Sequence, residues 1–333
     1  MTVSLEAIAK RSVNLASPRL GTQVIFATDD FFAAKERMIQ DSDPVFIADK
    51  YDDHGKWMDG WESRRRRDGG RDHAIIKLGT AGVIHAASID TNHFTGNFAP
   101  AASIEGCFSE TEPGDQTEWR ELLAPYTLGP DAEHLVAVDC DQPVNWIRLT
   151  MFPDGGIARL RLYGETRPDW SAVGASETVE LSALKNGGRI VGYNNAHYGS
   201  TWTLLTEGRG INMGDGWETR RRREPGHDWI VLALGHAGTI DEIEIDTAHF
   251  KGNFPDSASV HAAFVDKSTD EALITQSMFW QPLLPQVKLQ ADHIHRFDSS
   301  TIEKLGPVTH VRLNIFPDGG VSRFRTFGKR HID

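Results

Sequence analysis

The stretch RLTMFPDGGIARLRLYG, residues 148–164, decides the fold of this chain. Around its start, Ile147 just before the stretch and Leu149 and Met151 within it alternate with polar or small residues, which is the period of a strand with one buried face. In the central FPDGG the proline presets its φ angle and the glycines permit positive φ, so the chain turns there. A second alternating run follows the turn, and the stretch therefore predicts a β-hairpin.

The same stretch recurs as RLNIFPDGGVSRFRTFG, residues 312–328, with 10 identities in 17 positions. Farther upstream, residues 59–108 match residues 215–264 at a constant shift of 156 without a gap, and 26 of these 50 positions are identical. Similarity over such lengths indicates an internal duplication whose unit is far longer than a solenoid repeat. The chain therefore contains two copies of one domain.

A stretch rich in Gly, Pro and small polar residues separates the copies and is typical of a linker. We predict an N-terminal segment at 1–19, the first copy at 20–165, the linker at 166–186 and the second copy at 187–330. Short apolar runs bounded by glycine, such as AIIKLG and WIVLALG, are typical of strands, whereas helical periodicity is scarce, with LEAIAKR and KERMI as the better helix candidates. The predicted fold class is mainly β, with two tandem β-sandwich jelly-roll domains.

Composition and charge narrow the class of protein. With 333 residues, of which 39% are hydrophobic and 25% charged, the chain has the balance of a soluble globular protein of two domains. The formal net charge of −12 argues against a polyanion such as nucleic acid as the partner. Two cysteines are too few for a disulfide framework or a Cys-rich zinc site. Because no signal peptide and no long apolar run is present, we expect a cytoplasmic protein with no membrane partner.

Each copy carries an arginine run, DGWESRRRR at residues 59–67 and DGWETRRRR at residues 215–223. Four consecutive arginines can form a nuclear-localisation or nucleic-acid patch, but acidic residues precede and follow each run. In an extended segment alternate arginines point to opposite faces, so two meet a site or the edge of the core while two stay in solvent. Two interpretations remain for these runs: ion pairs that tie strands together, and bidentate recognition of a carboxylate.

A second recurring cluster is DTNHFTGNF at residues 90–98, repeated as DTAHFKGNF at residues 246–254. Each directly follows a predicted strand, so its Asp, His and Asn side chains are positioned to project into a cleft. Histidine is the natural general acid or base near neutral pH, and the cluster supports an acid–base role and a structural role about equally. Its spacing matches no zinc motif that we can name.

Arginines also flank the predicted hairpin, and a solvated strand face is the default interpretation for them. They are Arg148, Arg159 and Arg161 in the first copy and Arg312, Arg323 and Arg325 in the second. Other polar positions differ between the copies: Glu105 is matched by His261, Asn92 by Ala248 and His73 by Trp229. Either one copy alone is catalytic, or a composite site takes different residues from each.

Both arginine runs are followed by a D-x-x-I/V-x-x-L-G strand (residues 72–79 and 228–235), and LASPRLGTQVIFATDDFFAAKERMI lies near the start of the chain at residues 15–39. Together with the DTNHFTGNF and FPDGG motifs and their repeats, these stretches resemble the allantoicase family. The likeness covers nearly the whole chain. One departure is that the first copy has His73 where the second has Trp229, so the aromatic residue at this strand position is not kept. The resemblance implies a repeated jelly roll of the galactose-binding type. It also implies a hydrolase of linear amidines that converts allantoate to ureidoglycolate and urea in allantoin degradation.

Allantoate carries a carboxylate and two ureido groups on one carbon, so its site needs guanidinium donors together with Asn, Asp or Glu. The net charge of −12 repels an anion at long range, but screening beyond about 8 Å lets local arginines prevail. Candidate substrate-binding residues are Arg64, Asn97 and Arg159 in the first copy and Arg220, Asn253 and Arg323 in the second. Candidate catalytic residues are His93, Glu62 and Asp90 and their counterparts His249, Glu218 and Asp246.

In the hypothesis that follows from the resemblance, the histidine protonates the departing urea and the carboxylates assist water. The remaining ureido nitrogen pushes electrons toward the central carbon and forms an imine that water captures. A divalent metal ion is an alternative means of polarising the substrate, although no ligand spacing stands out and no other cofactor is expected. The expected partner is the small molecule allantoate, and we expect a homo-oligomer.

Two functions outside this hypothesis stay open. A tandem carbohydrate-binding module needs exposed aromatic platforms, for which Trp61 and Trp217 are the candidates. Both lie inside a DGWE segment, which suits an anchor in the core better than an exposed platform. A cupin-like metal oxygenase needs two histidines and a carboxylate as metal ligands, and we do not assemble such a triad from this sequence.

Overall fold

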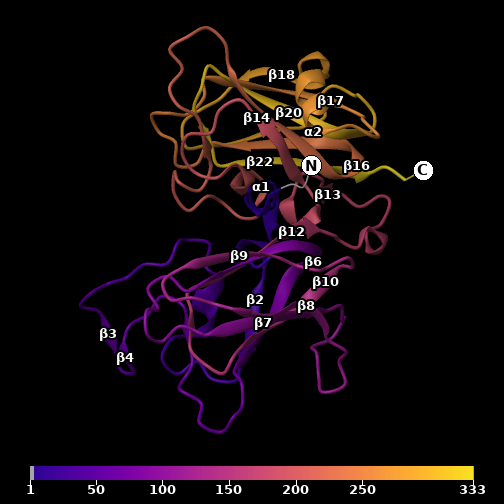
Figure 1. Cartoon of the computed structure of the whole chain (residues 1–333). Coiled ribbons are helices and arrows are strands. Elements are labelled where there is room, and N and C mark those ends of the chain that lie inside the picture. The colour runs from indigo at the N-terminus through magenta and orange to yellow at the C-terminus, as the bar shows by residue number, and fades with distance from the viewer. Residues whose placement is uncertain (1–3, 333) are drawn as a thin grey trace. The chain divides into compact units, whose positions relative to one another are not determined.

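One long strand runs through each copy (Figure 1), and four other strands pair with its two halves. The structure, a computed structural model, describes residues 4–332. In the first copy the long strand is β6 (His73–Asp90), whose first half pairs with β2 (Gln23–Ala27) and β10 (Val144–Met151). Its second half pairs with β9 (Glu133–Ala137) and β12 (Arg159–Thr166). The two halves therefore belong to the two layers of a β-sandwich.

The remaining elements of the first copy extend these layers or connect them, and the strand order is β1-β12-β6-β10-β7-β8. These elements are α1 (Leu5–Arg11), β1 (Val13–Asn14), η1 (Pro18–Leu20), η2 (Lys35–Ile39), β3 (Tyr51–Asp52), β4 (Gly55–Lys56), β5 (Trp61–Glu62), β7 (Ala101–Cys107), β8 (Arg120–Thr127) and β11 (Gly156–Ile157). Both helix candidates from the sequence are helical: LEAIAKR is α1, and KERMI is the 3-10 helix η2.

The second copy repeats the arrangement in the order β13-β22-β16-β20-β17-β18, with β16 (Asp228–Asp246) as its long strand. Its other elements are η3 (Trp170–Ala172), β13 (Val179–Glu180), η4 (Leu184–Asn186), β14 (Arg189–Tyr193), η5 (Thr201–Leu205), β15 (Trp217–Glu218), β17 (Ser257–Ala263), α2 (Asp270–Gln276), η6 (Ser277–Phe279), β18 (Gln281–Lys288), β19 (Ile294–Phe297), β20 (Val308–Phe316), β21 (Gly320–Val321) and β22 (Arg323–Arg330). The prediction of a mainly β chain of two tandem jelly-roll sandwiches is confirmed.

The chain divides into two units, the first ending at Pro168 and the second beginning at Asp169. Residues 169–186, most of the predicted linker, therefore belong to the second unit. The reason is backbone pairing: Val179 of β13 lies opposite Gly328 of β22, in the same sheet as the rest of the second copy.

The glycine that ends each short apolar run marks a close approach of two backbones. A Cβ on Gly79 would lie 1.8 Å from the carbonyl oxygen of Leu20, and a Cβ on Gly235 would lie 1.8 Å from that of Asn186. No side chain fits at that distance. The long strands can therefore pass from one layer to the other only with glycine at this point.

The predicted β-hairpin at residues 148–164 is wrong in one respect, although both of its strands exist. β10 and β12 do not pair with each other, because each pairs with a different half of β6. The FPDGG turn crosses between the layers instead, and the short strand β11 that follows pairs with β5 of the DGWE segment. Alternation of polar and apolar residues shows which face of a strand is buried and says nothing about which strand lies beside it.

A buried ion pair ties the DGWE segment of each copy to the strand that follows the FPDGG turn, β12 or β22. Arg159 is 0% exposed and donates from Nη2 to Oδ2 of Asp59 at 2.7 Å. Arg323 is 1% exposed and makes the same bond to Asp215 at 3.0 Å. Other N–H groups of Arg159 donate to backbone carbonyl oxygens, including that of Asp59 itself. Arg159 thus neutralises the carboxylate of Asp59 and donates a hydrogen bond to the carbonyl oxygen of the same residue.

We expect Arg159→Met to lower the free energy of unfolding by about 3–5 kcal/mol, because it leaves Asp59 as a largely buried charge without its cation. Urea denaturation measures the loss. The matched control is Arg167→Met, which breaks a pair with Glu165 whose two side chains are both about half exposed, and it should cost less than about 1 kcal/mol. Equal losses in the two variants would contradict the structural role of the buried pair.

Candidate functional site

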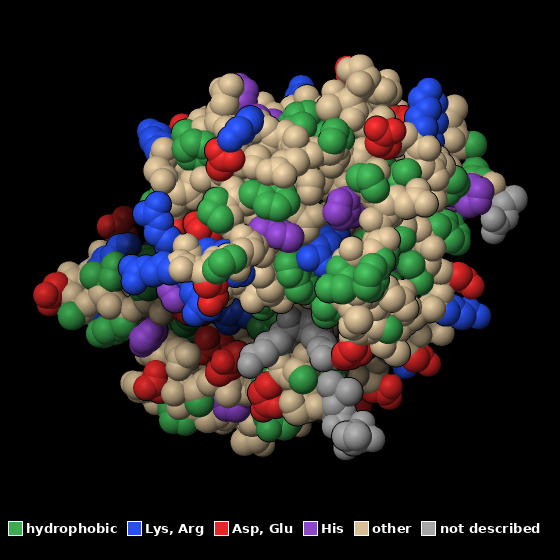
Figure 2. Space-filling model, turned by 90° about the horizontal axis from the view of Figure 1, so that it is seen from above, with side chains coloured by type: hydrophobic (Ala, Val, Ile, Leu, Met, Phe, Trp, Pro, Cys, Tyr) green, Lys and Arg blue, Asp and Glu red, His purple; other side chains and the backbone are tan. Residues whose placement is uncertain are grey.

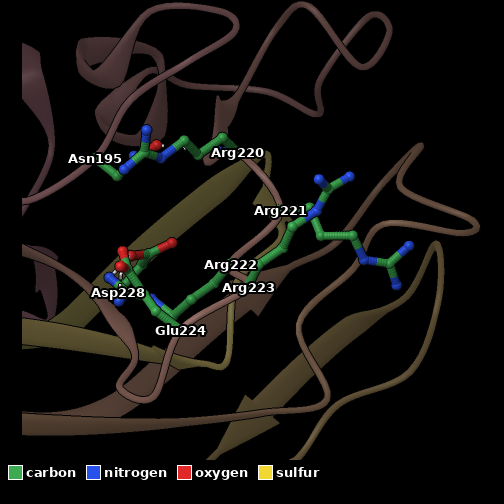
Figure 3. A pocket seen from close by; sticks show the side chains of 7 residues that line it. All are labelled: Asn195, Arg220, Arg221, Arg222, Arg223, Glu224 and Asp228. Atoms are coloured by element: carbon green, nitrogen blue, oxygen red, sulfur yellow. Dashed lines mark hydrogen bonds and ion pairs between the residues drawn. The ribbon is translucent and has the colours of Figure 1, made fainter.

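Two cavities, one in each copy, lie against the arginine runs. The cavity of the first copy has a volume of about 520 Å³ and is lined by Thr28, Asp29, the four arginines, Asp68 and Asp72. The cavity of the second copy has a volume of about 480 Å³ and is lined by Asn195, the four arginines, Glu224 and Asp228 (Figure 3). The two cavities occupy equivalent places in the two copies.

The FPDGG turn holds each arginine run in place. Asp154 is buried, and its Oδ2 accepts a hydrogen bond from the backbone N–H of Arg66 at 2.8 Å. Asp318 accepts the equivalent bond from Arg222 at 2.9 Å. The backbone N–H of Ser63 also donates to the turn, to the carbonyl oxygen of Gly155 at 3.1 Å. The run therefore leaves the DGWE segment at a defined point and in an extended conformation.

The arginines alternate in direction, as an extended segment requires. In Figure 3, Arg220 and Arg222 point toward Asn195 and Asp228, whereas the other two arginines of the run point away from them. Arg222 is half-buried and donates from Nη2 to Oδ1 of Asp228 at 2.7 Å. Alternate members of the run therefore face Asn195 and Asp228, although all four arginines line the cavity.

A buried carboxylate lines each cavity. Asp72 and Asp228 are both 1% exposed, and the Oδ1 atom of each accepts an arginine N–H, from Arg66 at 2.8 Å and from Arg222 at 2.7 Å. The second oxygen of each, Oδ2, has no hydrogen-bond partner among the residues that the structure describes. Because a buried acceptor without a partner costs roughly 1–3 kcal/mol, these two oxygens are suited to accept a hydrogen bond from a ligand N–H group.

The residue opposite the first arginine of the run differs between the copies. Asp29 Oδ1 accepts the backbone N–H of Arg64 at 2.9 Å, and Asn195 Oδ1 accepts that of Arg220 at 3.0 Å. Asp29 also accepts Nε of Arg64 at 2.7 Å. Burial alone would raise the pKa of the Asp29 carboxyl, but the hydrogen bonds and charge of Arg64 hold that pKa below its ordinary value.

A glutamate and an asparagine pair beside each arginine run. Asn97 Nδ2 donates to Oε1 of Glu62 at 2.7 Å, and Asn253 makes the same bond to Glu218. Glu62 is 9% exposed, and this burial raises the pKa of its carboxyl while the bond from Asn97 opposes the shift. The structure thus brings together the predicted site residues Glu62 and Asn97, and likewise their counterparts in the second copy.

The predicted histidines lie in strained turns and bond to backbone. His93 has φ of 71° and His249 has φ of 45°, in the left-handed region that few non-glycine residues adopt. Nε2 of His93 lies 3.2 Å from the carbonyl oxygen of Pro44, and Nε2 of His249 lies 2.6 Å from that of Gly210. One ring nitrogen of each histidine is therefore used to anchor a loop.

The aspartates of the same motif begin these turns. Oδ1 of Asp90 accepts the backbone N–H of Asn92 at 2.7 Å, and Oδ1 of Asp246 accepts that of Ala248 at the same distance. Burial raises the pKa of Asp90, against the bond from Asn92. Their burial and these bonds favour a structural role in the turn over contact with a substrate.

The remaining predicted residues are in the core. Arg159 and Arg323 are at most 1% exposed, so a substrate cannot reach their guanidinium groups without displacing Asp59 or Asp215. The tryptophans proposed as sugar platforms, Trp61 and Trp217, are both 0% exposed, and each indole N–H donates to a backbone carbonyl at 2.8 Å. Burial removes the aromatic platform on which the carbohydrate-binding alternative depends.

Sequence reasoning missed the residues that complete the cavities, namely Asp72 and Asp228 and the pair Asp29 and Asn195. A signal for the first two was present, because D-x-x-I/V-x-L-G opens with Asp72 in one copy and Asp228 in the other. Their burial beside an arginine depends on the fold, so the motif alone could not assign the role. Asp29 and Asn195 lie in a region where the two copies differ, and no repeated pattern marked them.

Other classes of site are not visible in the part of the chain that the structure describes. Residues 4–332 contain no group of three or more His, Cys, Asp or Glu side chains gathered as metal ligands. No described helix is long and apolar enough to cross a membrane. On the face shown in Figure 2, acidic side chains lie among the basic ones instead of leaving a continuous basic surface.

Known proteins similar to this chain share its duplication. The model of the allantoicase repeat family matches residues 13–167 and residues 179–331. A relative from Ralstonia nicotianae named probable allantoicase is 55% identical over 320 residues, which cover 96% of this chain and 95% of the relative. A probable allantoicase from Photobacterium profundum is 53% identical over 317 residues, covering 95% of this chain and 96% of that relative.

Solved structures agree with the sequence relatives. The crystal structure of allantoicase from Saccharomyces cerevisiae is 36% identical to this chain, with a TM-score of 0.79, and the match covers 97% of this chain and 96% of that one. A second allantoicase structure, also 36% identical, gives a TM-score of 0.78. Since the similarity extends over nearly the whole length of every protein compared here, the chain belongs to the allantoicase family.

Proposed function

We propose that allantoate binds in a cavity beside an arginine run and that the adjacent glutamate of the DGWE segment transfers the protons. Membership of the allantoicase family identifies the reaction, in which a carbon–nitrogen bond of allantoate is hydrolysed to give ureidoglycolate and urea during allantoin degradation. We propose which residues bind the substrate and which transfer protons in this reaction.

The proposal rests on one feature of the cavities, a buried carboxylate oxygen without a partner beside a guanidinium-rich wall. Allantoate presents both complementary groups within a few bonds, because its carboxylate suits a guanidinium and its ureido N–H groups suit a carboxylate acceptor. Oδ2 of Asp72 or of Asp228 accepts the ureido N–H in this arrangement. A ligand with only a carboxylate would leave that oxygen unpaired.

Glu62 and Glu218 are the proposed proton carriers. Burial raises the pKa of Glu62, and a pKa nearer neutrality improves a carboxyl as a general acid or base. Asn97 and Asn253 fix the orientation of these carboxyls by donating to one oxygen of each, which leaves the other oxygen for the reaction. The general acid protonates the departing ureido nitrogen, and the resulting carboxylate takes a proton from water.

The bonds and charges balance without a further reactant. The lone pair of the retained ureido nitrogen, which keeps its hydrogen, forms a cationic imine (an iminium ion) as the bond from the central carbon to the other nitrogen breaks, and urea leaves with the proton from the glutamate. Water then adds to the imine carbon and returns a proton to the glutamate. The oxygen of that water becomes the hydroxyl of ureidoglycolate.

We assign His93, His249, Asp90 and Asp246 to holding the turns that carry Asn97 and Asn253. Their support is the bonding described above, in which each histidine ring anchors a loop and each aspartate caps a turn. A direct proton transfer by the second ring nitrogen of His93 or His249 is the competing hypothesis. The glutamate and histidine variants described below distinguish these two hypotheses.

The setting of the protein is part of the proposal. We propose a cytoplasmic homo-oligomeric enzyme with allantoate as its small-molecule partner and with neither nucleic acid nor membrane as a partner. Cys107 and Cys140, both buried, carry free thiols, in keeping with a reducing compartment.

In water enriched in ¹⁸O, the purified protein should release unlabelled urea and ureidoglycolate that carries one ¹⁸O atom. The physical reason is that water attacks the central carbon and the urea carbonyl stays intact. Mass spectrometry of both products measures the label, and a reaction in ordinary water is the control. Label in urea would contradict the imine step, and the absence of urea would contradict the function itself.

The double variant Glu62→Gln and Glu218→Gln should lose roughly 10²–10⁴-fold in kcat, because glutamine keeps the bond to asparagine and cannot carry the proton. Urea release under saturating allantoate measures the loss. The comparison is the double variant His93→Ala and His249→Ala, whose expected effect is mainly a lower thermal midpoint. If the histidine variant loses kcat at unchanged thermal midpoint while the glutamate variant does not, the roles are reversed.

Folding stability should report the raised pKa of Glu62. A group whose folded pKa lies above its unfolded pKa, about 4.3 for Glu, stabilises the fold below that value and loses this contribution as the pH rises through the folded pKa. The stability of the wild type relative to Glu62→Gln should therefore fall as the pH rises above about 4.3. Urea denaturation at several pH values measures this difference. The control Glu110→Gln, at an exposed position, should show no such trend.

A further inference from the structure

Asp29 and Asn195 occupy the same place in the two copies. Each accepts, through Oδ1, the backbone N–H of the first arginine of the run. Each also offers its own carbonyl oxygen to the indole N–H of the DGWE tryptophan, at 2.8 Å in both copies. With two identical anchors, the residues differ only in the second side-chain atom, an anionic oxygen in the first copy and a neutral amide nitrogen in the second.

In the first copy, the arginine at this place is already occupied. Oδ2 of Asp29 accepts Nε of Arg64 at 2.7 Å and lies 2.6 Å from its Nη2, so one carboxylate oxygen already occupies the two guanidinium donors that a carboxylate ligand would engage. The guanidinium also lies over the ring of Phe31, at 5.0 Å from the centroid. Phe31 in turn stacks with His54 next to the β3–β4 hairpin, an element for which the second copy shows no equivalent strands in its described residues.

In the second copy, the equivalent arginine has no such partner. Among the described residues, the Arg220 side chain makes no hydrogen bond and no ion pair, because an amide nitrogen cannot accept from a guanidinium. Nε of Arg222 is buried and has no hydrogen-bond partner in the described part of the chain. Both side chains point into the space between Asn195 and Asp228 in Figure 3.

The side chains that line the second cavity also carry a more positive total charge than those that line the first. Four guanidinium groups line each cavity, but three carboxylates face them in the first copy and two in the second. Arg66 pairs with Asp68 and Asp72 in the first copy, and Arg222 pairs with Glu224 and Asp228 in the second, so the copies differ in charge compensation at Arg64 and Arg220. The second cavity therefore keeps one more uncompensated positive charge than the first for binding an anion.

We propose that the carboxylate of the substrate binds in the cavity of the second copy, in two-point contact with Arg220, and that Asp29 takes the place of that carboxylate in the first copy. One chain then binds one substrate anion, with the ureido N–H donating to Oδ2 of Asp228. This assignment rests on the proposed function for the identity of the ligand. The division between the copies is set by a single side chain, Asn195.

Exchanging the two side chains tests the assignment. Asn195→Asp builds in the second copy the ion pair that the first copy already has, so its thermal midpoint should not fall while its KM for allantoate rises at least tenfold. The matched control is Asn212→Asp, which adds the same charge at an exposed position of the second copy outside the cavity, and its KM should stay within twofold. A KM of Asn195→Asp within twofold of the wild type would overturn the proposal.

Binding stoichiometry gives an independent readout. Ureidoacetate has the carboxylate and one ureido group of the substrate but no second ureido nitrogen to expel, so it binds without reacting. Isothermal titration should find one ureidoacetate per wild-type chain, none for Asn195→Asp, and two for Asp29→Asn, which releases Arg64. Two per wild-type chain, or one per Asn195→Asp chain, would overturn the proposal.

The experiments distinguish a failure of the proposed function from a failure of the assignment of the anion site to the second copy. If the wild type releases no urea from allantoate, the proposed function fails, and the ureidoacetate stoichiometry still decides whether the second copy is the anion site. If the wild type releases urea and Asn195→Asp matches it in both KM and ureidoacetate binding, the proposed function stands and the assignment to the second copy is wrong.

Discussion

The buried ion pair between Arg159 and Asp59, repeated as Arg323 and Asp215, is the interaction on which the rest of each copy depends. A guanidinium removed from water needs an anion and acceptors for its remaining N–H groups, and the aspartate that opens the DGWE segment supplies a carboxylate and a backbone carbonyl. Because this bond sets where the segment begins, the tryptophan two residues later enters the core and the arginine run emerges at the cavity. Core anchor and binding residues thus follow one another in one continuous stretch.

The FPDGG turn joins that segment to the other recurring motif. A Cβ on Gly156 would lie 2.1 Å from the ring of Phe94, so this glycine lets the turn pack flat against the DTNHF motif. On its other side, Asp154 holds the backbone of Arg66. Three motifs that lie far apart in the chain therefore meet at one end of the sandwich, and the same three motifs occur in both copies. Against that constant scaffold, the difference between a carboxylate and an amide at one position changes the electrostatics of the whole cavity.

Patterns in the sequence predict the strands better than their partners. The alternation of Ile147, Leu149 and Met151 correctly marks a strand with one buried face, yet β10 pairs with β6 and β7 and not with β12. The alternation of the four arginines follows from the geometry of an extended segment and is visible in Figure 3. For His93 the residue type suggests acid–base chemistry, but the positive φ and the bond to a distant carbonyl oxygen depend on a loop that packs there only in the folded chain.

The sequence by itself determined the duplication, the mainly β fold, the family and with it the reaction, because these depend on residue patterns that extend over tens of positions. Only the tertiary structure decided that Asp72 and Asp228 hold a buried oxygen without a partner and that Asp29 and Asn195 face equivalent arginines. The physical reason is that hydrogen-bond partners and burial belong to groups brought together from separate strands. The charge that a cavity offers to a ligand depends on every side chain that lines it.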